Sequence, residues 1–133
     1  MQNVFVYGTL RAGEINDINS AAARHDIAPP TWIGSTTVKG RLYDFGSYPG
    51  LVVDQKGTPV VGDVYEIEDA LIAVLDEIEE IYPGVEGLFR SRDVTVDVDG
   101  AAVPCRFYPV AKEAVAGLTE IVCGDWVAHR LAR

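Results

Sequence analysis

The sequence is poor in the residues that build disulfide scaffolds and metal sites. It has two cysteines and two histidines among 133 residues, whereas small secreted scaffolds carry more cysteines to stabilise a small core. The spacing of Cys105, Cys123, His25 and His129 is not that of zinc ligands. We therefore expect both cysteines to be reduced, Cys105 to lie in a strand, and no metal or cofactor to be bound.

Long apolar runs and an excess of positive charge are also missing. No run approaches the roughly 20 apolar residues needed to cross a bilayer, and the first residues lack the basic segment of a signal peptide. The cytoplasm is therefore the expected compartment, without a membrane partner. The net charge of −9 repels phosphate backbones, so nucleic acid is not an expected partner either. Nothing in the sequence indicates an oligomeric state.

What is present suits one folded domain. Hydrophobic residues make up 48% of the chain and charged residues 23%, which is enough to fill one core and argues against disorder. We expect residues 1–133 to form a single domain. The predicted strands cover residues 2–7, 31–45, 51–53, 60–67, 92–98 and 103–110, with tight connections at 54–57 and at Asp99-Gly100.

One main helix and one or two short helices complete the prediction. The main helix covers residues 70–80, with Asp69 as its N-cap and Pro83-Gly84 beyond its end. Short helices are expected around residues 21–23 and 125–131. Gly34 and Gly40 inside the long strand indicate bulges or bends. The predicted class is therefore α+β: a small mixed β-barrel or strongly curved sheet, with the helices packed against it.

Glu79 is the acidic residue that stands out in the main helix. At 3.6 residues per turn, Leu71, Leu75 and Ile72 fall on one apolar face, and Glu79 falls at about 80° from Leu71, between Leu75 and Ile72. Burial of a carboxylate raises its pKa, as does a place at the negative end of the helix dipole. Such a carboxylate suits general acid–base catalysis. An ion pair with Arg90 or Arg92 is the competing explanation for the same placement.

A glycine turn follows the first strand, at Tyr7-Gly8-Thr9-Leu10-Arg11. Consecutive backbone N–H groups in such a turn can face an anion, such as a carboxylate or a developing oxyanion. A glycine that simply ends a strand is the alternative. The glycine and lysine spacing of a Walker loop or a dinucleotide fingerprint is absent, and the serines lack the setting of a nucleophile elbow.

Several segments together resemble the γ-glutamylcyclotransferase-like family, which includes γ-glutamylamine cyclotransferases and AIG2-like proteins. The resemblance covers nearly the whole chain in order, although no single piece is specific. It rests on these segments: Val6-Tyr7-Gly8-Thr9-Leu10-Arg11, Gly40-Arg41-Leu42-Tyr43-Asp44, Tyr48-Pro49-Gly50-Leu51-Val52, Val60-Val61-Gly62-Asp63-Val64-Tyr65-Glu66-Ile67, Leu75-Asp76-Glu77-Ile78-Glu79 and Cys123-Gly124-Asp125-Trp126.

The resemblance implies a function and a set of site residues. It implies that Glu79 is the catalytic acid and base, that the turn formed by Tyr7, Gly8, Thr9 and Leu10 binds a small γ-glutamyl substrate through its N–H groups, and that Tyr108 lines the pocket. The implied reaction converts a γ-glutamyl amine or γ-glutamyl amino acid to 5-oxoproline and a free amine, without a cofactor.

The chain also departs from the family pattern. Glu80 stands where many members have glycine, and Ser91 stands where an arginine is frequent. Two alternatives therefore stay open beside the cyclotransferase: a non-catalytic module that binds small molecules on the same fold, and an enzyme that removes a γ-glutamyl protecting group in a biosynthetic pathway. The amine attached to the glutamyl group is not indicated by the sequence.

Overall fold

The computed structural model describes residues 1–80 and 91–132, with side chains for all of these except Glu79 and Glu80. The elements in chain order are β1 (Gln2–Val6), α1 (Ile18–Arg24), β2 (Thr31–Asp44), β3 (Pro49–Val53), β4 (Thr58–Ile67), α2 (Asp69–Glu80), β5 (Arg92–Val98), β6 (Ala101–Phe107), the 3-10 helix η1 (Lys112–Val115), β7 (Thr119–Glu120) and α3 (Trp126–Ala132). The predicted α+β class is confirmed.

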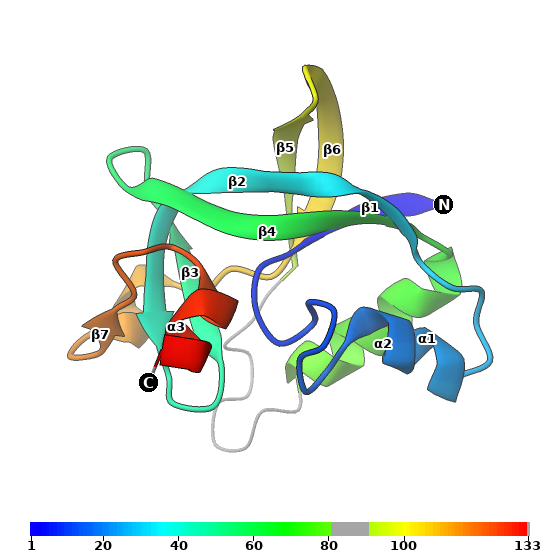
Figure 1. The fold of residues 1–133 in the computed structure, drawn as a ribbon, viewed down its shortest axis with the longest axis horizontal. Coiled ribbons are helices and arrows are strands. Elements are labelled where there is room, and N and C mark those ends of the chain that lie inside the picture. Colours follow the sequence, from blue (N-terminus) through cyan, green and yellow to red (C-terminus); the bar gives the residue numbers. More distant parts are fainter. Residues whose placement is uncertain (81–90, 133) are drawn as a thin grey trace.

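The strands form one curled, mixed sheet. Its order is β3-β2-β4-β1-β6-β5, and β7 pairs with the end of β2. The neighbours are antiparallel except β1 and β6, which run parallel. Figure 1 shows β2 and β4 side by side along their length, with the β5–β6 hairpin rising away from them. The register of β2 against β4 shifts between Trp32 and Gly34, so the predicted irregularity near Gly34 is confirmed.

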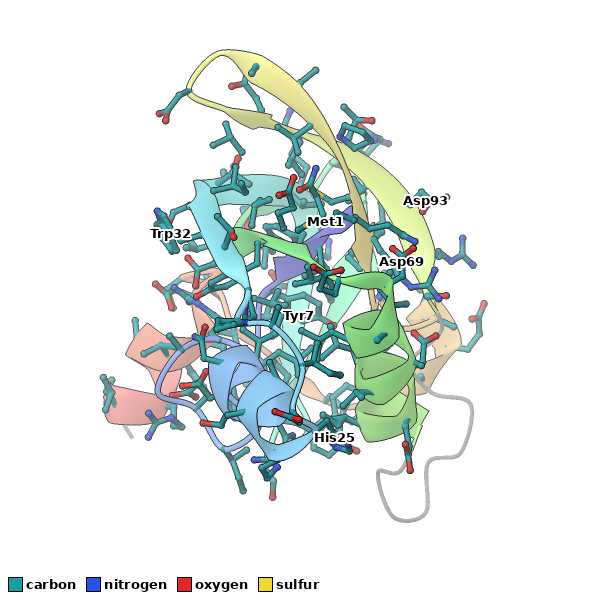
Figure 2. All side chains as sticks on the ribbon, turned by 90° about the vertical axis from the view of Figure 1, so that its right-hand side faces the viewer. Met1, Tyr7, His25, Trp32, Asp69 and Asp93 are labelled. Carbon is teal, nitrogen blue, oxygen red and sulfur yellow. The ribbon has the colours of Figure 1, made fainter. Side chains whose placement is uncertain are left out.

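The sheet separates two groups of buried side chains, as the alternation along β1 requires. Val4 and Val6 belong to the group that packs with α1 and α2, whereas Phe5 and Tyr7 belong to the group inside the curl, with residues of β2, β4, β5 and β6. Figure 2 looks onto α1 and α2, which lie next to each other on one side of the sheet. The end of β1 therefore lies between the two halves of the core.

Helix α2 has the predicted apolar face. Leu71 and Leu75 are fully buried and Ile72 is 9% exposed, whereas Glu77 is exposed. The helix begins at Asp69, so this residue lies in the first turn and the N-cap prediction is wrong by one position. A carboxylate in the first turn still faces the positive end of the helix dipole, which explains why the sequence signal was nearly right.

The last predicted strand is shorter than expected. β6 ends at Phe107 rather than Val110, because Val110 N–H donates to the Leu51 carbonyl of β3 instead of continuing the ladder. The short elements η1 and β7 follow, and neither was predicted. Cys105 lies in β6 as expected, and both cysteines are free. No helix in the described ranges is long and apolar enough to cross a bilayer.

Candidate active site

The turn after β1 is built against the start of β3. A side chain at Gly8 would place its Cβ 2.6 Å from Cγ of Pro49, so only glycine fits against this proline ring. Thr9 and Leu10 are buried, at 5% and 3% exposure. The Arg11 N–H donates to the Gly8 carbonyl at 3.1 Å and closes the turn. The two segments that carried the family resemblance at Gly8 and Pro49 are therefore in direct contact.

The carbonyl groups of Gly8, Thr9 and Leu10 point toward the residues that follow the turn. Besides the Gly8 carbonyl, the Thr9 carbonyl accepts from Asn16 N–H and the Leu10 carbonyl accepts from Ile18 N–H, each at 2.9 Å. A planar trans peptide holds its N–H antiparallel to the preceding carbonyl. The N–H groups of Thr9 and Leu10 therefore point away from these partners.

The Tyr7 side chain fastens three segments together. Its hydroxyl donates to the Tyr108 carbonyl at 2.7 Å and accepts from the Leu51 N–H at 3.1 Å. The ring is 6% exposed, and in Figure 2 it lies in the interior behind the two helices. The Tyr7 hydroxyl thus joins the ends of β1 and β6 to β3, whereas the predicted substrate contact concerns its backbone.

Tyr108 connects the same region to α2. Its ring is 4% exposed, and its hydroxyl donates to Asp76 Oδ1 at 2.6 Å. Arg106 reaches the same carboxylate, with Nη2 3.1 Å from Oδ2. Burial, and then the hydrogen bond to Asp76, raise the pKa of Tyr108 far above its ordinary value. Tyr108 therefore stays a neutral phenol and holds α2 against the end of β6.

Glu79 lies in the last turn of α2 by its backbone, three residues after Asp76. Its side chain lies outside the part of the molecule that the structure describes, as does Arg90, one of the two arginines considered as its ion-pair partner. Arg92, the other arginine, is exposed at the start of β5. The catalytic role of Glu79 remains a prediction, as do the substrate contacts of the turn and of Tyr108.

A cavity of about 250 Å³ opens beside the turn. One wall is the loop that leaves the turn, another is α3, and the third is the connection between β2 and β3. The Glu14 carboxylate in this wall is held by Arg130 at 2.7 and 2.9 Å. The lining residues are Thr9, Gly13, Glu14, Ile15, Ser47, Trp126 and Arg130. A small ligand bound at the turn therefore has room to extend toward α3.

Sequence reasoning missed the charged residues that support the site. Asp76 stands out in the sequence only as part of a motif, although it carries the contacts to Tyr108 and Arg106. Arg11 was noted only as part of a motif, yet it binds Asp63 and Asp125. The one available signal is that Arg11, Asp63, Asp76 and Asp125 fall inside segments of the family resemblance. Among the described residues, no three His, Cys, Asp or Glu side chains are grouped so that they could hold a metal ion.

Comparisons with known proteins agree with this arrangement. The family model described as gamma-glutamyl cyclotransferase, AIG2-like, matches residues 4–128. The gamma-L-glutamyl-butirosin B gamma-glutamyl cyclotransferase of Niallia circulans is 34% identical over 136 residues, which cover 98% of this chain and 79% of that protein.

Solved structures show the same fold. An AIG2-like protein of Mus musculus superimposes with a TM-score of 0.73 at 25% identity, covering 90% of this chain and 84% of the other. YkqA of Bacillus subtilis superimposes with a TM-score of 0.72 at 27% identity over 98% of this chain, which spans only 41% of YkqA. The chain therefore belongs to the gamma-glutamyl cyclotransferase, AIG2-like family and is an enzyme of this type.

Proposed function

We propose that the protein converts a γ-glutamyl amine or γ-glutamyl amino acid to 5-oxoproline and the free amine. The observation that carries the proposal is the turn at Gly8–Arg11, whose carbonyls are engaged on one side so that the N–H groups of Thr9 and Leu10 face the other. These donors would hold the α-carboxylate of the glutamyl group, or its γ-carbonyl oxygen as negative charge develops there.

The helix that carries Glu79 is anchored close to this turn. Tyr108 links the two: its carbonyl accepts from the Tyr7 hydroxyl, and its own hydroxyl donates to Asp76. Leu10 and Leu75 belong to the same buried cluster. These contacts support the proposal that a substrate bound at the glycine turn reaches toward the end of α2.

Glu79 is proposed as the general acid and base of the reaction. The α-amine of the glutamyl group attacks the γ-carbonyl carbon, a C–N bond forms and closes a five-membered lactam, and the original amide C–N bond breaks. Glu79 takes the proton from the attacking amine and delivers it to the departing nitrogen. Because attack is intramolecular, holding the substrate in a folded shape supplies much of the rate acceleration.

Glu79→Gln tests this assignment. The amide has nearly the same shape as the carboxylate but cannot accept and return a proton, so kcat for 5-oxoproline release should fall by about 100-fold or more. Glu77→Gln is the matched control, because Glu77 is exposed on the same helix. Equal product release from the Glu79→Gln variant and the parent enzyme would refute the catalytic role.

One relative favours a more specific version of this function. The Niallia circulans protein takes its name from a γ-glutamyl compound, γ-L-glutamyl-butirosin B. We propose the removal of a γ-glutamyl protecting group as the second candidate, with the attached amine extending into the cavity beside Thr9. A panel of γ-glutamyl amines of increasing size separates the two: a kcat/KM that rises with the size of the amine favours deprotection.

A further inference from the structure

Arg11 leaves the glycine turn and enters the interior of the protein. Its side chain is 14% exposed, and its guanidinium bonds two carboxylates: Nε lies 3.0 Å from Oδ2 of Asp63, and Nη1 lies 3.0 Å from Oδ1 of Asp125. Asp63 is a residue of β4, 8% exposed, and also accepts from the Ser35 hydroxyl of β2 at 2.9 Å. The end of the turn is therefore fixed to two central strands by charged hydrogen bonds.

Asp125 brings the closing motif of the chain to the same arginine. The Asp125 carboxylate also accepts from the Ala128 N–H at 3.2 Å and so caps the start of α3. The residue before it, Gly124, has a φ of +70°, and a Cβ there would collide with the Pro59 carbonyl. The Gly124 carbonyl accepts from the Val61 N–H at 2.7 Å. These contacts fix the position of Asp125 relative to β4.

We infer that Asp125, acting through Arg11, is a positioning residue for the glycine turn. The Arg11 cluster, which is Arg11 with Asp63 and Asp125, contains one positive and two negative side chains. The charge of Arg11 is thus already neutralised and cannot supply the attraction for a bound anion. Its effect on the turn is geometric, because the same residue donates its N–H to Gly8 and anchors its side chain across β4 and α3.

This inference rests on the proposed function in one respect, namely that the turn binds the glutamyl group. Without Asp125, Arg11 would keep its ion pair with Asp63 but lose its anchor to the start of α3. The Arg11 end of the turn would then sample more shapes, and the turn would bind the same ligand more weakly. A shift of the binding groups by a fraction of an ångström lowers the population of reactive complexes. Loss of the Asp125 contact should therefore act mainly on substrate affinity, whereas loss of Glu79 should act on the chemical step.

Asp125→Ser is the decisive variant. A serine at this position can still cap α3, but its side chain is too short to reach Arg11. We expect KM for a γ-glutamyl amine to rise by about tenfold with a smaller change in kcat, and amide hydrogen exchange in the peptide covering residues 7–13 to become faster. Arg11→Lys, which keeps the charge but not the forked guanidinium, should give an intermediate effect on both measurements.

Arg41→Gln is the matched control. Arg41 also binds two carboxylates, those of Asp54 and Glu120, but it lies in β2 away from the turn. This variant should leave KM and the exchange of residues 7–13 unchanged. If Asp125→Ser keeps both at parental values while the parent enzyme releases 5-oxoproline, the inference is wrong. If the parent releases no 5-oxoproline from any γ-glutamyl compound, the proposed function is wrong, and hydrogen exchange alone decides whether Asp125 fixes the turn.

Discussion

Two arginines of this protein make the same contacts in different surroundings. Arg11 binds Asp63 and Asp125, with nitrogen–oxygen distances of 3.0 Å. Arg41 binds Asp54 and Glu120, at 3.0 and 3.3 Å. The Asp63 side chain is 8% exposed, whereas the Asp54 side chain is 34% exposed. The comparison shows that an ion-pair count says little, because burial decides what happens when one partner is removed.

The Arg41 cluster (Arg41, Asp54 and Glu120) is a surface feature. The contacts shift the pKa values of both partners. The hydrogen bond to Asp54 raises the pKa of Arg41. The hydrogen bond from the Lys56 N–H, and then that from Arg41, lower the pKa of Asp54. Water solvates each of these groups when the other is absent, so the pair adds little to the free energy of unfolding. In the Arg11 cluster, Asp63 is buried, so water cannot take the place of Arg11 when the arginine is removed.

The largest expected effect separates the two arginines directly. Arg11→Met leaves the Asp63 carboxylate buried without its cation, so we expect a loss of about 3 kcal/mol in the free energy of unfolding. Arg41→Met should leave the urea midpoint unchanged within error. Urea denaturation of both variants at neutral pH, with the parent protein alongside, measures this difference. Equal midpoints for the two variants would show that the burial of Asp63 does not decide the effect of removing its arginine.

A second substitution tests whether the unpaired carboxylate causes this loss in the free energy of unfolding. If the unpaired carboxylate is responsible, Arg11→Met combined with Asp63→Asn should recover about 1 kcal/mol relative to Arg11→Met alone. The asparagine removes the charge and can still accept the Ser35 hydroxyl that now bonds Asp63. A double variant that is less stable than Arg11→Met would instead indicate that the packing of the arginine side chain matters more than its charge.

Asp17 provides the smallest contrast, since its carboxylate is held by backbone N–H groups rather than by an arginine. It accepts from Gly13 and Asn19, both at 2.8 Å, and caps α1. Partial burial acts to raise the pKa of Asp17, but the hydrogen bonds from Gly13 and Asn19 outweigh it and lower the pKa below the ordinary 3.8. Asp17→Ala should lower the free energy of unfolding by about 1 kcal/mol at neutral pH.

The pH dependence of that difference follows from the direction of the shift. A carboxyl group with a lowered pKa in the folded protein stabilises it above the unfolded value and loses this contribution as the pH falls through the folded value. The gap between Asp17→Ala and the parent should therefore narrow below about pH 4, in urea denaturation series at several pH values. A gap that stays constant down to pH 2.5 would contradict the role of the ionised carboxylate.

Local patterns predicted much of this fold. The helical spacing of Leu71, Ile72 and Leu75 predicted the buried face of α2, and the glycine at position 34 marked the irregularity in β2. These features depend on residues that are close in sequence, so a local sequence pattern is enough to predict them. The N-cap at Asp69 was misplaced by one residue because an acidic side chain is favourable both at the cap and in the first turn.

The supporting contacts of the site could not be predicted in the same way. Arg11 and Asp125 are separated by 114 residues, and only the order of the strands brings them together. Asp76 lies beside the apolar face of α2, and no helical periodicity shows that Tyr108 and Arg106 meet it there. Such pairs depend on the path of the whole chain, which a reading of local segments does not contain.

The contact between Arg11 and Asp125 also has a consequence for biosynthesis. During translation the first strand and its turn leave the ribosome long before Asp125 is made. Contacts between residues so far apart in sequence carry a large loop-closure entropy and slow folding. Strand β1 also pairs with β6 across about the same separation. We therefore expect strands β1 to β4 to pair first, and the turn after β1 to be fixed only when most of the chain has been made.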